Sequence, residues 1–415
     1  MIDRFFRLGL GFFITIFVAR YLGPDYFGKW NYSVAIISLL SILSTFGMSQ
    51  AILKFILSNE TPEHIILGTA FFMRLMGSIL ASILSCLYIY ISQDDKIVLT
   101  ITFISSMTLW FQPFDIIELK FQSILASRKS VIVKGGSFFI TSILKLFVVF
   151  YKMPFILIII CTSLEFFIGA IGLLSYYGLN NFINWKFDFN YFKVLVKYCW
   201  PLTLSGVFVM FYMRLDQVMI GNMIGTKAVG FYSISTRFTE LFYFIPSLFV
   251  TSFLPKIVSS QREGRHKYLD SCLSLSKIFF IISLSISIFF YISSDYIINI
   301  LYGVQYFPAV FSLKISVWTG IFVFWGVASG NMLLMDNMNH HGFKRSFQGL
   351  ILNALLNIFL IPLYGINGAA CATLISQFYA SYLYLVLFKE TRYIFILQTK
   401  SILFFKKYNH SPEFQ

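Results

Sequence analysis

The sequence predicts an all-α protein that crosses a membrane about twelve times. Of its 415 residues, 58% are hydrophobic and only 12% are charged, whereas soluble domains carry about 25% charged residues. Apolar stretches of about 20 residues recur along the whole chain, and a helix of that length spans a hydrocarbon core of about 30 Å. A water-soluble fold could not bury this much apolar surface.

The expected membrane spans follow these apolar stretches in chain order. They are 5–21, 31–50, 66–91, 97–124, 131–151, 155–177, 197–220, 229–254, 273–293, 309–334, 345–362 and 366–388. A polar and aromatic stretch, NNFINWKFDFNYFKVLVK, separates the first six spans from the last six. We therefore expect four parts: an N-terminal six-helix bundle at 1–178, a cytoplasmic linker at 179–196, a C-terminal six-helix bundle at 197–388 and a basic cytoplasmic tail at 389–415.

The two halves share a weak repeat at a constant offset of 202 residues. Residues 23–58 align without gaps with 225–260, and Gly28 matches Gly230. In both halves a Gly-x4-Gly turn precedes a span that has a Lys at its inner end. Six crossings return the chain to its starting side, so such a repeat is parallel, an arrangement known among secondary transporters. The alternative is that glycine turns and lysine anchors recur in any membrane protein.

The basic residues indicate the orientation of the chain. Lys and Arg are roughly three times as frequent in the inner loops and termini as in the outer loops, which predicts that both termini are cytoplasmic. The net charge is +14, but the basic residues form no single stripe or arm, so we expect no nucleic-acid partner.

No metal centre and no cofactor are expected. The five cysteines lie singly in apolar segments, without the spacing of a zinc site or a disulfide framework. His340 and His341 are adjacent, so on a helix they would point about 100° apart, and we expect a solvated pair in a loop. A coupling ion, H⁺ or Na⁺, remains open.

Ionisable residues inside the expected spans are the main candidates for function. Each costs about 2.5 to 3.5 kcal/mol near the bilayer centre and faces a partner or a wet cavity. Lys145 lies close enough to the outer end of its span for its amine to snorkel to the surface. Arg237 and Glu240 are three residues apart, so they share a helix face and can pair. The set is Arg74, Lys145, Glu165, Arg237 and Glu240.

Other charges lie near the ends of spans. Arg214 and Asp216, at the outer end of one span, fit interfacial residues and functional residues equally well. Asp115 and Glu118 lie beside Lys120 at an inner end, where we expect a solvated surface cluster. The role of Glu165 and Glu240 stays open between carrying a coupling proton and pairing with arginine.

The excess of buried cations favours an anionic cargo. A lipid-linked glycan carries a pyrophosphate between its isoprenoid and its sugar, and moving that group through a bilayer requires fixed positive charge. A multidrug extruder would instead favour acidic residues facing a cationic drug. A membrane glycosyltransferase or polysaccharide polymerase is disfavoured, because the chain has only the adjacent Asp94 and Asp95 and no Asp-x-Asp motif.

Four segments resemble the polysaccharide transporter family, the O-antigen type flippases of the multidrug/oligosaccharidyl-lipid/polysaccharide exporter superfamily. That superfamily also contains multidrug/toxin extruders and peptidoglycan lipid flippases. The segments are ARYLGPDYFGKWNYS at 19–33, RLDQVMIGNMIGTKAVGFYSISTRF at 214–238, LYGVQYFPAV at 301–310 and IPLYGINGAACATLIS at 361–376.

The resemblance implies two six-helix bundles around a central cavity and alternating access, with no enzymatic step. It places a basic residue of the family pattern at Arg237 and an Arg-x-Asp pattern at Arg214 and Asp216, and it puts Arg4 and Arg7 at the inner mouth of the first helix.

The implied cargo is an undecaprenyl-pyrophosphate-linked oligosaccharide repeat unit. The resemblance implies that it crosses a bacterial cytoplasmic (inner) membrane for export as O-antigen or capsule. Membrane lipid, a polysaccharide polymerase and a chain-length regulator are the implied partners. A multidrug/toxin extruder of the same superfamily and a membrane polymerase or glycosyltransferase are the alternatives.

Overall fold

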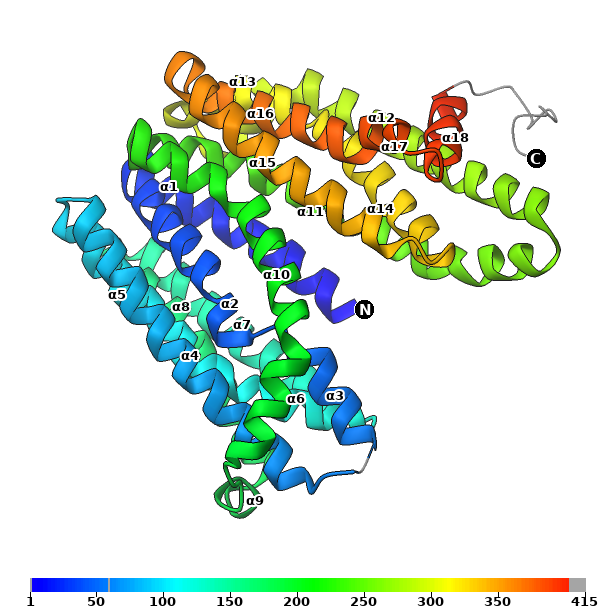
Figure 1. Ribbon diagram of the computed structural model, residues 1–415. Coiled ribbons are helices and arrows are strands. Elements are labelled where there is room, and N and C mark those ends of the chain that lie inside the picture. Colours follow the sequence, from blue (N-terminus) through cyan, green and yellow to red (C-terminus); the bar gives the residue numbers. More distant parts are fainter. Residues whose placement is uncertain (1, 59, 403–415) are drawn as a thin grey trace. The chain divides into compact units, whose positions relative to one another are not determined.

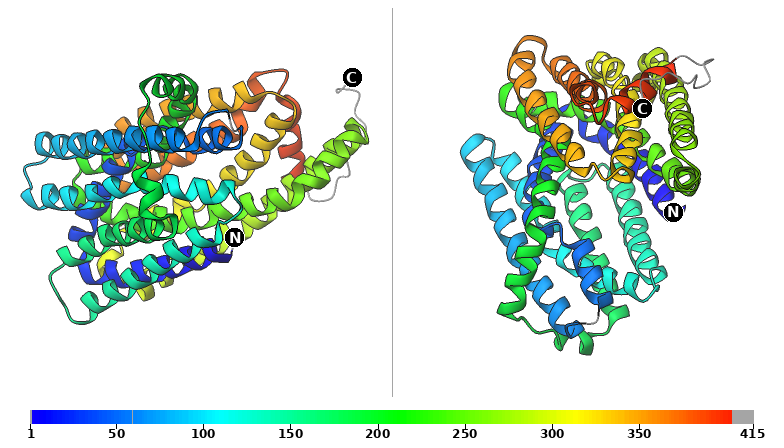
Figure 2. Two further views of the ribbon diagram at one scale, coloured as in Figure 1. Left: turned by 90° about the horizontal axis from the view of Figure 1, so that it is seen from below. Right: turned by 45° about the vertical axis from the view of Figure 1, so that its right-hand side comes forward.

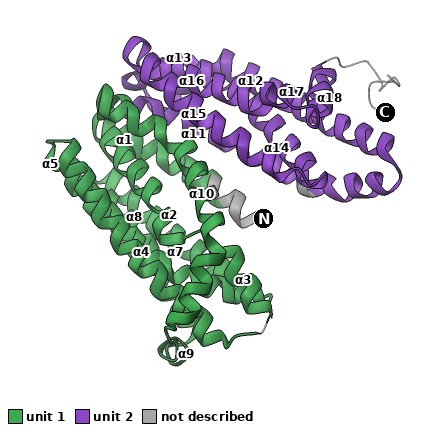
Figure 3. Ribbon diagram, in the orientation of Figure 1, with its two compact units in different colours: residues 1–230 green, residues 231–415 purple. Residues whose placement is uncertain are grey.

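The computed structural model describes residues 2–58 and 60–402 (Figure 1). All regular secondary structure in these two ranges is helical, which confirms the expected all-α class. The chain divides into two compact units, residues 1–230 and 231–415 (Figure 3). The helix α10 lies in the first unit, and α11 begins there.

The helices that lie wholly or largely in the first unit are α1 (Ile2–Leu40), α2 (Ile42–Thr45), α3 (Ser49–Ser58), α4 (Glu63–Ser92), α5 (Lys96–Phe111), η1 (Gln112–Phe114), α6 (Asp115–Ser123), α7 (Arg128–Phe150), α8 (Ile156–Tyr177), α9 (Leu179–Ile183) and α10 (Phe189–Met223). Those of the second unit are α11 (Thr226–Arg262), α12 (Arg265–Tyr302), η2 (Val304–Tyr306), α13 (Ala309–Ser316), α14 (Thr319–Met335), α15 (Asn339–Tyr364), α16 (Ile366–Phe378), the π-helix η3 (Tyr379–Leu383), α17 (Tyr384–Leu387) and α18 (Arg392–Ile402).

The protein is a multi-pass membrane protein. Within the described ranges, nine helical segments are long and apolar enough to cross a membrane, or eleven if two bent pairs each form one span. The first of these segments, Gly9–Ser58, has 50 residues and contains both of the first two expected spans. The count therefore agrees with twelve crossings.

The first two spans meet at a kink inside α1. Gly23 has φ 67° and ψ 172°, a backbone conformation that glycine adopts without the steric cost paid by other residues. Pro24 follows and cannot donate a hydrogen bond to the preceding turn. The second span does not run unbroken to residue 50 as expected, because the helix ends at Leu40 and resumes as α2 and then α3.

Several other expected spans are interrupted helices. The span at 97–124 breaks at η1, where Pro113 lacks an N–H donor. The span at 309–334 consists of α13 and α14, and the last span contains the π-helix η3. A mid-helix π turn widens the backbone locally. Apolar length alone does not reveal such breaks.

The expected linker packs against the first unit. Its Trp185 is buried, and the backbone N–H of Lys186 donates to the carbonyl of His64 at 3.2 Å. A Cβ placed on Gly68 would lie 2.4 Å from the carbonyl oxygen of Lys186. The linker segment therefore lies directly against α4, and α10 already begins at Phe189.

Two glycines matched by the repeat contact each other's helix. A Cβ on Gly28 would lie 2.0 Å from the carbonyl oxygen of Thr226, and a Cβ on Gly230 would lie 2.3 Å from that of Pro24. Pro24 and Thr226 are themselves partners at the offset of 202. Such a reciprocal contact is what a two-fold related pair of segments produces, and it supports the repeat at this point of the first unit.

The second unit has its own core, which includes the first part of the expected tail. Figure 2 gives two further views of its helices. Tyr393, Ile394 and Leu397 of α18 are buried in one cluster with Tyr268 and Leu269 of α12. Apolar burial of this kind stabilises by about 25 cal/mol per Å². Residues 392–402 are thus an integral helix of the second unit.

Candidate functional site

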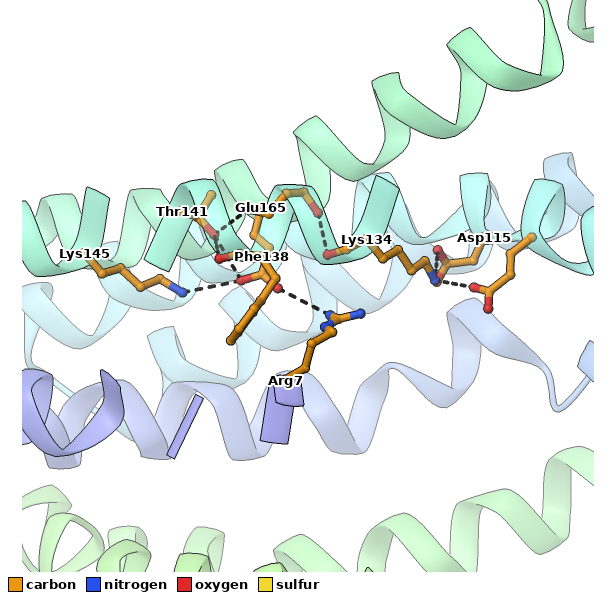
Figure 4. A network of polar contacts seen from close by, with 9 residues as sticks. Arg7, Asp115, Lys134, Phe138, Thr141, Lys145 and Glu165 are labelled. Atoms are coloured by element: carbon orange, nitrogen blue, oxygen red, sulfur yellow. Dashed lines mark hydrogen bonds and ion pairs between the residues drawn. The ribbon is translucent and has the colours of Figure 1, made fainter. Parts of the chain in front are cut away.

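A cluster of charges in the first unit joins three helices around Glu165 (Figure 4). Glu165 lies on α8, and one of its carboxylate oxygens is 3.8 Å from the guanidinium of Arg7 on α1. The other oxygen is 3.5 Å from the amine of Lys145 on α7. Thr141, one turn before Lys145 on α7, donates its hydroxyl to that same oxygen at 3.5 Å. Two cations therefore share one carboxylate.

The side chains of the triad Arg7, Glu165 and Lys145 differ in their exposure to solvent. The side chain of Lys145 is 11% exposed and that of Glu165 is 16% exposed, whereas that of Arg7 is 32% exposed. The guanidinium of Arg7 also lies over the ring of Phe138, 5.3 Å from its centroid, a cation–π contact. The triad of Arg7, Glu165 and Lys145 carries one net positive charge, with Arg7 as its most accessible member.

The triad continues along α7 to a second group of charges. Lys134 lies 2.8 Å from Asp115 and 2.5 Å from Glu118, both on α6 (Figure 4). Lys120, expected to complete a solvated cluster with these carboxylates, instead pairs with Glu63 of α4. The two carboxylates keep a solvated side, since the side chain of Asp115 is 40% exposed and that of Glu118 is 29% exposed, and Lys134 of α7 is their cationic partner.

Arg74 is 4% exposed on α4, deep in the first unit. One guanidinium nitrogen donates to the hydroxyl of Ser49 on α3 at 3.1 Å. Its Nε has no hydrogen-bond partner among the described residues. A buried guanidinium whose fork is only partly used is costly unless a further acceptor binds it.

The candidate residues on α10 and α11 are not part of the triad of Arg7, Glu165 and Lys145. Asp216 is buried on α10, and Arg214 beside it is half-buried. Arg237 and Glu240 are half-buried on α11 in the second unit.

The structure therefore brings together Arg7, Lys145 and Glu165. The roles of all these residues remain predictions. Arg4 belongs to α1, but its side chain lies outside the described residues.

Sequence reasoning missed a row of buried polar contacts along α15 in the second unit, which we call the polar seam. Arg345 of α15 donates to the hydroxyl of Ser329 at 2.5 Å and to the carbonyl of Gly326 at 2.9 Å. Further along α15, Asn353 lies 3.4 Å from the hydroxyl of Thr373 on α16. Asn353 also accepts a hydrogen bond from Asn357 at 3.1 Å, so the seam continues along α15. Both asparagines are fully buried, and their spacing of four residues inside an expected span was the available signal.

The expectation of a solvated histidine pair was wrong. His341 is 3% exposed and lies in the first turns of α15, with Nδ1 3.0 Å from the hydroxyl of Tyr384. His340 is exposed beside it. The helix begins earlier than the apolar stretch suggested, so the two rings belong to a helix and not to a loop.

Comparison with known proteins decides the family. The family model described as "Polysaccharide biosynthesis protein" matches residues 17–311. The chain belongs to this family. Membership confirms the resemblance that the sequence motifs indicated.

Curated relatives of this polysaccharide biosynthesis protein are named as flippases or capsule proteins. A probable low-salt glycan biosynthesis flippase, Agl15 of Haloferax volcanii, is 24% identical over 90% of the chain and 79% of its own length. The probable flippase AglR of the same organism is 31% identical, but the match spans only 44% of the chain and 38% of AglR. The capsular polysaccharide biosynthesis protein CapF of Staphylococcus aureus is 20% identical over 91% of the chain and 95% of its own length.

Solved structures show the fold of the polysaccharide biosynthesis protein. The lipid II flippase MurJ in an inward closed conformation superposes with a TM-score of 0.74 over 100% of the chain and 93% of MurJ, at 16% identity. An inward-facing multidrug resistance MATE family transporter of the MOP superfamily superposes with a TM-score of 0.66 over 95% of the chain and 96% of that protein, at 11% identity. The chain therefore has the fold of these transporters.

Proposed function

We propose that the protein is a flippase that carries a lipid-linked oligosaccharide across a membrane by alternating access. The observation that carries the proposal is the family match over residues 17–311, together with one relative named as a probable flippase, Agl15, that is matched over 79% of its own length. The fold shared with MurJ is consistent with it. The finer proposal is an undecaprenyl-pyrophosphate-linked repeat unit destined for O-antigen or capsule, with no covalent step.

The triad around Glu165 offers a physical route for an anionic head group. Arg7 is the more exposed of its two cations and stands at 3.8 Å from the carboxylate. A pyrophosphate that enters can bind the guanidinium of Arg7 through two hydrogen bonds. Such a bidentate contact is stronger than the single long ion pair between Arg7 and Glu165. Lys145 then keeps Glu165 neutralised. When the head group leaves, Arg7 returns to Glu165, so the emptied site does not keep a free guanidinium.

The rival functions differ in charge and chemistry. A multidrug extruder shares the fold, but the triad carries a net positive charge, which disfavours a cationic drug. A polymerase or glycosyltransferase would need a catalytic group, and the triad contains only paired charges. We further propose that the protein lies in the inner membrane with cytoplasmic termini. We also propose that transport is coupled to an ion, H⁺ or Na⁺, and that a polymerase and a chain-length regulator are partners. The cytoplasmic placement of the termini follows from the lysine and arginine bias, and the inner-membrane location follows from the family resemblance.

The test of the proposal is a deletion strain. We expect lipid-linked repeat units to accumulate on the cytoplasmic face and surface polysaccharide to be lost, while drug susceptibility is unchanged. Lipid-linked repeat units that still reach the outer face at the wild-type rate would rule out a flippase. Hypersensitivity to cationic drugs with normal polysaccharide would identify an extruder.

Arg237→Ala is expected to abolish surface polysaccharide while the full-length protein accumulates in the membrane at the wild-type level. The reason is that Arg237 is a half-buried cation on α11, and its positive charge would attract the anionic cargo. Surface polysaccharide and membrane-bound protein are measured in the same cells. Arg262→Ala, an exposed arginine at the end of the same helix, serves as the matched control and should keep export. Full-length polymer in the Arg237 variant would exclude this arginine from transport.

Arg74→Lys is expected to keep partial export and Arg74→Glu none. Lysine preserves the buried charge but loses the planar guanidinium, one nitrogen of which donates to Ser49. Glutamate reverses the charge at this buried position. Export is quantified against the amount of protein in the membrane. Equal export by the two variants would show that the charge of Arg74 has no part in binding the cargo.

A further inference from the structure

Three side chains with metal-binding atoms meet where α15 begins and where the chain leaves α17. His340 and His341 belong to the first turn of α15, and Glu390 lies in the turn between α17 and α18. One nitrogen of each histidine and a carboxylate oxygen of Glu390 all lie within 4.8 Å of one another. The carboxylate comes from 49 residues further along the chain, so the fold brings this group together.

His341 is the anchored member of the group. Its ring is 3% exposed, and Nδ1 lies 3.0 Å from the hydroxyl of Tyr384, which is fully buried. The other nitrogen, Nε2, lies 3.3 Å from Oε2 of Glu390. Histidine ligands of metals commonly use one nitrogen for the metal while the other is held by a polar partner, which fixes the ring orientation. Tyr384 is placed to supply that partner.

The separations fit a small tetrahedral site. Metal–nitrogen and metal–oxygen bonds of about 2.0 Å give ligand-to-ligand separations of about 3.3 Å in a tetrahedron, which is the separation already present between His341 and Glu390. His340 and Glu390 are exposed, so their side chains can close the remaining gap by rotating about their own bonds. A fourth position stays open to water.

The second imidazole distinguishes this group from a simple ion pair. A hydrogen bond between His341 and Glu390 needs only one histidine, yet the ring of His340 lies 4.2 Å from that of His341. Two imidazoles and one carboxylate are a donor set that transition metals bind. Lys344, one turn along α15, and Lys389, beside Glu390, oppose any divalent cation. Nitrogen ligands offset this for transition metals, whereas hard cations such as Mg²⁺ gain little from them.

We propose that His340, His341 and Glu390 form a binding site for a divalent transition metal of the zinc, cobalt or nickel class. The metal fastens the turn before α18 to the first turn of α15. Because α18 packs into the core of the second unit, the site ties the C-terminal helix to that unit. The site has no part in the proposed transport step, so the two proposals fail independently.

The test is metal binding to the full-length protein, purified in detergent without a polyhistidine tag and stripped with a chelator. We expect one equivalent of Co²⁺ per chain, with the intense visible absorption of a tetrahedral complex, displaced by Zn²⁺. His340→Gln and Glu390→Gln change exposed residues, and each should weaken binding at least tenfold. Tyr384→Phe should weaken it about tenfold, the lower end of the cost of losing an outer-shell partner.

The control is His64→Gln, which removes an exposed imidazole from the first unit and should leave Co²⁺ binding unchanged. Zn²⁺ should raise the melting temperature of the wild type and of His64→Gln but not that of His340→Gln. The melting-temperature measurement uses a substitution at the exposed His340. It therefore does not require a variant of the buried His341, which could fail to fold. Wild-type protein without saturable Co²⁺ binding, or His340→Gln with wild-type affinity, would overturn the proposal.

Discussion

Gly28→Ala is expected to prevent stable folding of the first unit. The added methyl group would lie 2.0 Å from the carbonyl oxygen of Thr226. The obstacle is backbone, so a rotamer change cannot relieve the clash and the two helices must separate. Overpacking in a close-packed interior commonly costs 1–3 kcal/mol, and we expect about 3 kcal/mol or more here. Protein level in the membrane and melting temperature in detergent are the measurements.

Gly230→Ala should have an effect of similar size, because its added methyl group would meet the carbonyl oxygen of Pro24 at 2.3 Å. Gly136→Ala is the matched control, since a Cβ on this helical glycine of α7 meets nothing within 4 Å. That control should fold normally, and alanine's higher helix propensity favours it slightly. Wild-type melting of the Gly28 variant would show that these helices do not depend on their close approach.

Glu165→Gln is expected to abolish export and to lower the melting temperature. The substitution keeps the shape of the side chain but leaves Arg7 and Lys145 without a counter-charge. Breaking a fully buried ion pair costs 3–5 kcal/mol. Because Arg7 is about a third exposed and solvent screens it, we expect about 2 kcal/mol. Export per amount of membrane protein and thermal melting are measured together.

The double variant Lys145→Gln with Glu165→Gln separates stability from transport. It removes one charge of each sign, so the melting temperature should recover, while export should remain impaired because Arg7 has lost the carboxylate to which it returns. Glu263→Gln, at an exposed carboxylate that pairs with Lys267, is the control and should change neither quantity. Normal export by Glu165→Gln would exclude the triad from transport.

Much of the fold was accessible from local patterns. Apolar length predicted the spans because a bilayer requires about 20 apolar residues per helix. The breaks were less accessible, because Pro113 lies in an apolar stretch and α3 is as hydrophobic as α1. Their positions inside expected spans marked Lys145 and Glu165 as candidates, but the contacts of Glu165 with both Lys145 and Arg7 depend on how α1, α7 and α8 pack.

The amino-acid sequence alone determined that this is a polytopic helical protein of a polysaccharide biosynthesis family, because hydropathy and short motifs are local properties of the chain. Tertiary structure alone decided which charges meet. Lys134 binds Asp115 and Glu118, Lys120 binds Glu63, and His341 meets Glu390. Ion pairs form over a few ångströms of space between residues distant in the sequence, and only the packing of the helices determines which of them come that close.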